Sequence, residues 1–191
     1  MRAFIGFDFS KQLKDHLANI QNVLKQNTER GTWVNPSNFH LTLKFLGEID
    51  HRQVDSIDLV LRKLSLNSLP ITVSLQSLGY FNKSDDEYRV LWLGLDGQIE
   101  KINKIYKELE ENMHYIGFEK ENRKFSPHIT LGRKIKTDVD FNLLEEMVNP
   151  YLGIEFVLDN LVLMKSEVVM RNRVYTPIKS YKFSNKNDNH R

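Results

Sequence analysis

His40-Leu41-Thr42-Leu43 and His128-Ile129-Thr130-Leu131 are two copies of one short pattern, in which a threonine follows a histidine by two residues. The copies lie 88 residues apart, and the same offset aligns Phe4-Ile5-Gly6-Phe7-Asp8 with Trp92-Leu93-Gly94-Leu95-Asp96. A single His-x-Thr occurs by chance in many chains, but two copies that each follow a matching apolar stretch indicate a duplication. We therefore expect a site built from both halves of the chain.

Each copy alternates between polar and apolar side chains, as does a strand with one buried face. His40 and Thr42 would then share one face, while the leucines next to them point to the other face, into a core. His128 and Thr130 repeat this arrangement. If a pseudo-two-fold axis relates the halves, the two polar faces meet across a groove that holds two imidazoles and two hydroxyls.

This set of side chains suits acid–base chemistry at a phosphate. Histidine titrates near neutral pH, so a neutral imidazole can take a proton from water while a protonated one gives a proton to a departing oxygen. The threonine hydroxyls can donate to the non-bridging phosphate oxygens, where negative charge sits during the displacement. The scheme needs no metal and no cofactor.

Two cations near the motifs are further candidates for phosphate binding. Arg133 is a forked donor, but strict alternation places it on the face opposite His128, so it reaches the site only if a bulge at Gly132 turns the strand. The position that matches it in the first copy is Phe45. Lys44 follows Thr42 by two residues, and alternation predicts it on the same face, in reach of phosphate or of solvent.

The composition is that of an ordinary globular protein of one domain. Among 191 residues, 40% are hydrophobic and 27% are charged, and the net charge of +2 neither favours nor excludes a nucleic-acid partner. The absence of cysteine excludes disulfides and thiolate catalysis. No apolar run approaches the roughly 20 residues of a membrane helix, and the N-terminal apolar stretch is too short for a signal peptide. We expect a cytoplasmic protein.

The periodicities predict an α+β fold in which two similar lobes, each a sheet with helices, form one domain over residues 1–184. Residues 185–191 are polar, and we expect them to be disordered. The predicted helices cover a segment that follows the capping residue Ser10, then 50–63, 98–114 and 141–148. The predicted strands cover 2–9, 40–46, 70–78, 88–95, 127–133, 154–165 and 174–183. Loops are predicted at 33–39, 82–86 and 119–124.

At the paired motifs the sequence resembles the 2H phosphoesterase superfamily, and within it the RNA 2′,3′-cyclic phosphodiesterases, which are also called LigT-like or 2′-5′ RNA ligase-like proteins. The resemblance covers most of the chain, and the paired motifs with their flanks are specific to the family. It rests on Trp33-Val34, Asn38 to Gly47, Leu91-Trp92-Leu93-Gly94, Arg123, Phe125, Pro127 to Arg133, Ser166 and Tyr175.

The resemblance implies a bilobal fold with the site between the lobes, and hydrolysis of a 2′,3′-cyclic phosphate at an RNA end to a 2′-phosphate. By carry-over, His40 is the general acid on the leaving 3′ oxygen and His128 is the general base on water. Thr42 and Thr130 would bind phosphate oxygens, with assistance from Arg133. The spacing alone is symmetric and does not assign the two histidine roles.

The implied partner is an RNA with a 2′,3′-cyclic phosphate end, such as a transfer RNA fragment, a repair intermediate or a decay fragment. We expect a monomer that neither binds a membrane nor requires a protein partner. The reverse reaction, 2′-5′ ligation, is known in the family, but the chain has no G-x-x-x-x-G-K-[ST] loop for an ATP-driven ligase.

Several alternatives remain open at this stage. The two histidines could be ordinary strand residues with local hydrogen bonds, or metal ligands, although neither motif holds a second ligand at a suitable spacing. The enzyme could act on a 2′-5′ oligoadenylate or a cyclic ADP-ribose phosphate. The chain could also be an RNA-end-binding module without turnover. Aromatic residues that could stack a nucleobase, or simply pack in the core, are Trp33, Phe45, Phe81 and Tyr88.

Overall fold

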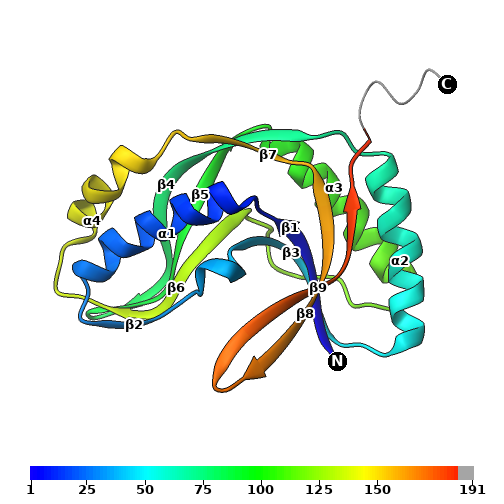
Figure 1. The fold of residues 1–191 in the computed structure, drawn as a ribbon, viewed down its shortest axis with the longest axis horizontal. Helices are drawn as coiled ribbons and strands as arrows, with labels where there is room; N and C mark the ends of the chain where they lie inside the picture. Colours follow the sequence, from blue (N-terminus) through cyan, green and yellow to red (C-terminus); the bar gives the residue numbers. More distant parts are fainter. Residues whose placement is uncertain (185–191) are drawn as a thin grey trace.

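The computed structural model describes residues 1–184 as two antiparallel sheets with helices packed against them (Figure 1). The predicted segment 185–191 lies outside the described residues. The four-stranded sheet has the order β3 (His40–Glu48), β1 (Arg2–Asp8), β8 (Asn160–Val169) and β9 (Asn172–Lys182). The five-stranded sheet has the order β2 (Arg30–Trp33), β6 (His128–Lys136), β5 (Glu87–Gly97), β4 (Ile71–Ser84) and β7 (Glu155–Leu158). The α+β prediction is confirmed.

The offset of 88 residues relates the two sheets as well as the two motifs. It carries the bounds of β3, residues 40–48, onto those of β6, residues 128–136. It also places β1 within β5, and in each sheet this strand pairs with the motif strand in antiparallel register. The two His-x-Thr segments therefore begin equivalent strands of the two sheets.

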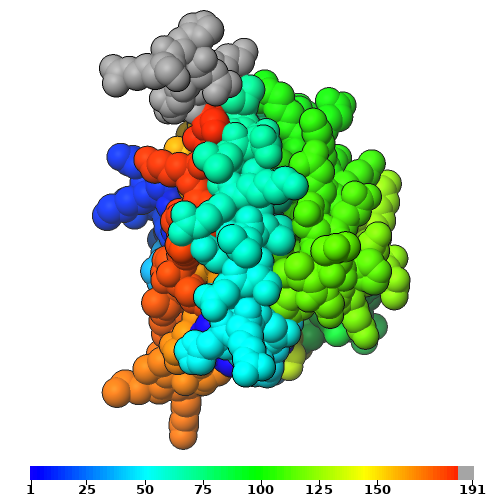
Figure 2. All heavy atoms as spheres, turned by 90° about the vertical axis from the view of Figure 1, so that its right-hand side faces the viewer, coloured from blue at the N-terminus to red at the C-terminus, as the bar shows by residue number. Residues whose placement is uncertain are grey.

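The first helix of each half makes contacts with the sheet to which the strand before it does not belong. α1 (Lys11–Gln26) follows β1 of the four-stranded sheet, but it lies beside α4 (Phe141–Val148) on the five-stranded sheet (Figure 1). Its buried Gln21 donates from Nε2 to the carbonyl oxygen of Leu131 in β6, at 2.9 Å. α3 (Ile99–Tyr115) follows β5 and lies beside α2 (His51–Leu66), and together these two helices cover the face shown in Figure 2.

Local sequence signals explain why the helices begin where they do. Ser10 caps α1, and its hydroxyl accepts from the backbone N–H of Leu13. Asp50 and Gln53 form a reciprocal capping box at the start of α2. The apolar faces of the helices and the inner faces of both sheets join in one continuous cluster of buried residues. No helix within residues 1–184 has the length and apolar content to cross a membrane.

Two loop predictions and one strand prediction were wrong, and strand pairing explains each difference. β2 lies partly within the predicted loop 33–39; it has no apolar alternation and exists through its pairing with β6. The hairpin of β4 and β5 extends to a two-residue turn at Asp85 and Asp86, so residues 82–84 belong to a strand. The predicted strand 154–165 divides into β7 and β8, because the chain passes from one sheet to the other at Asp159.

Close packing of β1 on β3 gives a testable prediction about Gly6. A Cβ at this position would overlap the backbone carbonyl oxygen of Leu41, which cannot move without disturbing the strand pairing. We expect Gly6→Ala to lower the free energy of unfolding by roughly 1–3 kcal/mol in urea denaturation. The equivalent Gly94→Ala is the matched control, because the short contacts of its Cβ would be with side-chain atoms, the Ser77 hydroxyl at 2.8 Å and the Trp92 ring at 3.3 Å. Equal losses in both variants would contradict this account of Gly6.

Candidate active site

A β-bulge lies just after each His-x-Thr and changes which side chains face the site. In β3, Ile5 pairs with Lys44 and Gly6 with Thr42, so Leu43 is the extra residue. In β6, Leu91 pairs with Gly132 and Trp92 with Thr130, so Leu131 is the extra residue. The two bulges occupy equivalent positions in the repeat. Beyond each bulge the alternation is reversed, which is the usual effect of one unpaired residue.

The bulge in β6 brings Arg133 to the face that carries His128. The side chain is exposed, lines the same groove as His128, and its charge contributes to lowering the pKa of that histidine. Phe45 occupies the equivalent place in β3, with 66% of its surface exposed.

The same reversal makes the prediction for Lys44 wrong. Lys44 points inward rather than along the face of Thr42, and only 4% of its side chain is exposed. Its ammonium pairs with the Glu110 carboxylate of α3, with 2.6 Å between Nζ and Oε1. The alternation rule failed here because the bulge depends on pairing with β1, which a local pattern does not contain.

Each imidazole is held through its Nδ1 by a backbone carbonyl two residues earlier in the chain. His40 Nδ1 donates to the oxygen of Asn38 at 2.7 Å, and His128 Nδ1 donates to the oxygen of Ser126 at 2.8 Å. Because a carbonyl can only accept, the neutral rings carry their proton on Nδ1 and a lone pair on Nε2. The Thr42 hydroxyl donates to His40 Nε2 at 2.8 Å.

Aromatic side chains enclose both histidine rings. The His40 centroid lies 4.7 Å from that of Phe4 and 5.1 Å from that of Tyr175. The His128 centroid lies 5.0 Å from that of Phe81 and 6.0 Å from that of Trp92. Phe4 and Trp92 are equivalent residues of the repeat, and their alignment in the sequence is a signal from which this packing could have been found. Tyr88, in contrast, is a core residue with 1% exposure.

Burial beneath these rings keeps both histidines neutral in the free protein. Desolvation is the main cause that lowers the pKa of His40 from 6.5 to about 4, and it also lowers the pKa of His128. The neighbouring charges differ. Asp8 favours a proton on His40, although Lys14, paired with it at 2.6 Å, opposes one, whereas Arg133 opposes a proton on His128.

A groove of about 870 Å³ opens beside the two motif strands, which are in contact with each other although they belong to different sheets. Thr42, His128 and Arg133 line it, together with Phe45 and Phe81. His40 lies behind Thr42 and does not line this groove; Thr130, half-buried on the same strand as His128, does not line it either.

The structure offers no ready set of metal ligands in the part of the chain that it describes. Within residues 1–184, no three His, Cys, Asp or Glu side chains come together as a candidate metal site.

Comparison with known proteins places this geometry in a family. The family model described as LigT like Phosphoesterase matches residues 7–92 and again residues 93–175. The RNA 2′,3′-cyclic phosphodiesterase of Methanocaldococcus jannaschii is 30% identical, covering 95% of this chain and 100% of its own. The protein of the same name from Thermotoga maritima is 35% identical, covering 79% of this chain and 84% of its own.

Solved structures show the same fold. E. coli LigT complexed with 3′-AMP superposes with a TM-score of 0.79 at 24% sequence identity, over 96% of this chain and 98% of that chain. The sequence matches, the fold and the duplicated motif agree. The chain therefore belongs to the LigT-like phosphoesterase family.

Proposed function

We propose that this protein hydrolyses 2′,3′-cyclic phosphate ends of RNA to 2′-phosphate ends, with His40 and His128 as acid and base and without a metal. The observation that carries the proposal is the pair of equivalent imidazoles, each fixed through Nδ1, so that Nε2 is the nitrogen for proton transfer once the Thr42 hydroxyl leaves that of His40. The names of the M. jannaschii and T. maritima relatives support the substrate, as does the 3′-AMP complex of E. coli LigT.

In the proposed reaction His128 acts as the base. Its Nε2 takes a proton from water, and the water oxygen forms a bond to phosphorus while the bond from phosphorus to the 3′ oxygen breaks. Arg133 supports this role in two ways. Its charge disfavours a proton on His128 in the free protein, and its guanidinium can donate to the non-bridging phosphate oxygens.

His40 acts as the acid in the same step. Its Nε2 gives a proton to the leaving 3′ oxygen, so that a 3′-hydroxyl and a 2′-phosphate result. In the free protein His40 is neutral at pH 7, because its pKa is about 4. The negative charge of a bound phosphodiester raises that pKa and so favours the protonated ring when the substrate is present. The Thr42 hydroxyl, released from Nε2, and the Thr130 hydroxyl can then donate to phosphate oxygens.

Removal of either imidazole tests the assignment. We expect His40→Ala and His128→Ala each to lower kcat by about 10²–10⁴-fold on an RNA with a 2′,3′-cyclic phosphate end, in excess chelator. We expect Thr42→Ala and Thr130→Ala to lower kcat less than the histidine variants do. His51→Ala, at an exposed position at the start of α2, is the control. Turnover of 2′-5′ oligoadenylate or cyclic ADP-ribose phosphate alone, or RNA-end binding without turnover, would contradict the proposal.

The titration of His40 provides a second test that does not need turnover. We expect the His40 ring in the free protein to change charge near pH 4, because burial opposes the imidazolium. Adenosine 2′-monophosphate, a product analogue, should move the transition to higher pH. Nitrogen-15 NMR of the imidazoles follows the titration with and without this ligand and reports which nitrogen is protonated. The spectrum of His40→Gln assigns the His40 signals. An ordinary titration near pH 6.5 in the free protein would contradict the burial argument.

A further inference from the structure

The segment between α3 and β6 forms one wall of the groove. Residues 118–127 contain no helix or strand, yet every residue from Glu119 to Ser126 lines the groove. The segment ends at the Ser126 carbonyl that holds His128. A segment without regular structure needs hydrogen-bond partners outside itself for its backbone N–H and C=O groups. These partners set the position of the groove wall.

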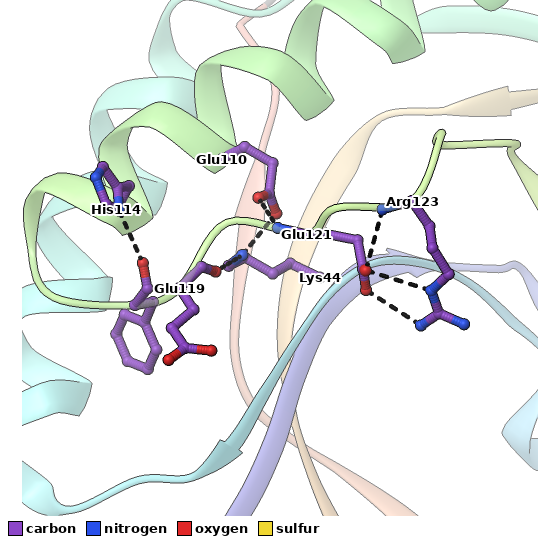
Figure 3. A network of polar contacts seen from close by, with 7 residues as sticks. Lys44, Glu110, His114, Glu119, Glu121 and Arg123 are labelled. Carbon is purple, nitrogen blue, oxygen red and sulfur yellow. Dashed lines mark hydrogen bonds and ion pairs between the residues drawn. The ribbon is translucent and has the colours of Figure 1, made fainter.

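The buried pair of Lys44 and Glu110 supplies two of those partners (Figure 3). Lys44 Nζ donates both to Glu110 Oε1 at 2.6 Å and to the backbone oxygen of Glu119 at 2.8 Å. The other carboxylate oxygen, Glu110 Oε2, accepts from the backbone N–H of Glu121 at 2.9 Å. One ion pair thus fixes the backbone of the segment at two points, two residues apart.

A stacked aromatic pair fixes the same segment farther along. The rings of Tyr106 in α3 and Phe125 lie 4.0 Å apart at an angle of 6°. Lys44 enters this arrangement from β3, only two residues after Thr42, because the bulge turns it inward. The contacts therefore connect the strand that carries His40 to the segment that leads into His128.

The burial of both charges indicates that the Lys44–Glu110 pair positions the segment rather than stabilises the fold. The side chains of Lys44 and Glu110 are only 4% and 9% exposed, so both charges have lost their hydration. Apolar side chains of similar size often replace such a pair with no loss of stability. Two apolar side chains, however, would leave the carbonyl of Glu119 and the N–H of Glu121 without these partners.

The groove that this wall completes suits a single nucleic-acid strand. Its volume of about 870 Å³ lies toward the upper end of small-ligand sites, which span roughly 300–1,000 Å³. Phe45 also lines the groove, and its side chain is 66% exposed. Apart from the internal pairs of Lys44 with Glu110 and Arg123 with Glu121, the charged lining residues are Arg89, Lys120, Lys124, Arg133 and Glu119. Positive charge with an exposed aromatic ring is the usual pattern for binding single strands.

We propose that the Lys44–Glu110 pair is a positioning device that holds the wall 119–126 against the RNA strand, so that Lys120 and Lys124 bind the nucleotides on the 5′ side of the reacting phosphate. This inference rests on the proposed function. All of the RNA except its terminal nucleotide lies on the 5′ side of a cyclic end, so the wall selects an oligonucleotide over a cyclic mononucleotide.

The test compares two substrates: a tetranucleotide with a 2′,3′-cyclic phosphate end and a 2′,3′-cyclic mononucleotide. The measured quantity is kcat/KM for the tetranucleotide divided by kcat/KM for the mononucleotide. We expect Lys44→Met/Glu110→Met to fold with a Tm near that of the wild type, since no charge is left buried alone. We expect its ratio to fall roughly tenfold through the KM of the tetranucleotide, an effect of the size of one lost base or phosphate contact.

A second variant removes the exposed cations and carries little risk of misfolding. Lys120→Ala/Lys124→Ala should lower the same ratio and weaken the salt dependence of tetranucleotide binding. Lys107→Ala, which removes an exposed cation of α3 that does not line the groove, should keep the wild-type ratio. An unchanged ratio in both double variants would overturn the inference, and so would an equal loss on both substrates.

The failure of this inference can be told apart from failure of the proposed function. If the wild type hydrolyses neither substrate, the proposed function fails. Fluorescence anisotropy with a labelled tetranucleotide that ends in a 2′-phosphate then decides the role of the wall. A Kd raised roughly tenfold in both double variants supports the strand-binding wall, and an unchanged Kd overturns it.

Discussion

The geometry of the site depends on two β-bulges, at Leu43 and Leu131. A regular strand would alternate through both motifs, with Arg133 directed into the core and Lys44 directed outward. One unpaired residue in each strand reverses this outcome. It brings a guanidinium beside His128, exposes an aromatic ring at the equivalent place in the other strand, and sends a lysine inward to the helix that supports the groove wall.

The bulges also show where the duplicated halves have diverged. The residue after each bulge is Lys44 in one half and Gly132 in the other, and both are buried. Lys44 reaches Glu110 and the connecting segment beyond α3. At Gly132 a Cβ would come within 2.9 Å of the Trp33 ring, so the backbone packs directly against that indole. Equivalent backbone thus supports a charged contact in one half of the repeat and an aromatic contact in the other.

Sequence reasoning recovered what is local or repeated. The offset of 88 residues predicted equivalent motif strands, and the short helix predicted at 141–148 coincides with α4. What it missed depends on partners far away in the chain. β2 forms only through its pairing with β6, and Lys44 turns inward because of the register of β3 with β1. The position of the wall 119–126 depends on its hydrogen bond to Glu110. The loop at 119–124 was predicted from its polar residues, but those residues do not indicate that the buried carboxylate of Glu110 positions it.

The exchange of helices between the sheets has a consequence for how the protein holds together. α1 follows β1 of the four-stranded sheet but packs on the five-stranded one, and α3 follows β5 of the five-stranded sheet but reaches β3 of the four-stranded one through the pair of Glu110 and Lys44. Each sheet also contains strands of both halves, since β8 and β9 complete the four-stranded sheet, and β2 and β4 lie in the five-stranded sheet. A cut between the halves would therefore leave unpaired strand edges in both sheets and expose an apolar helix face at the same time.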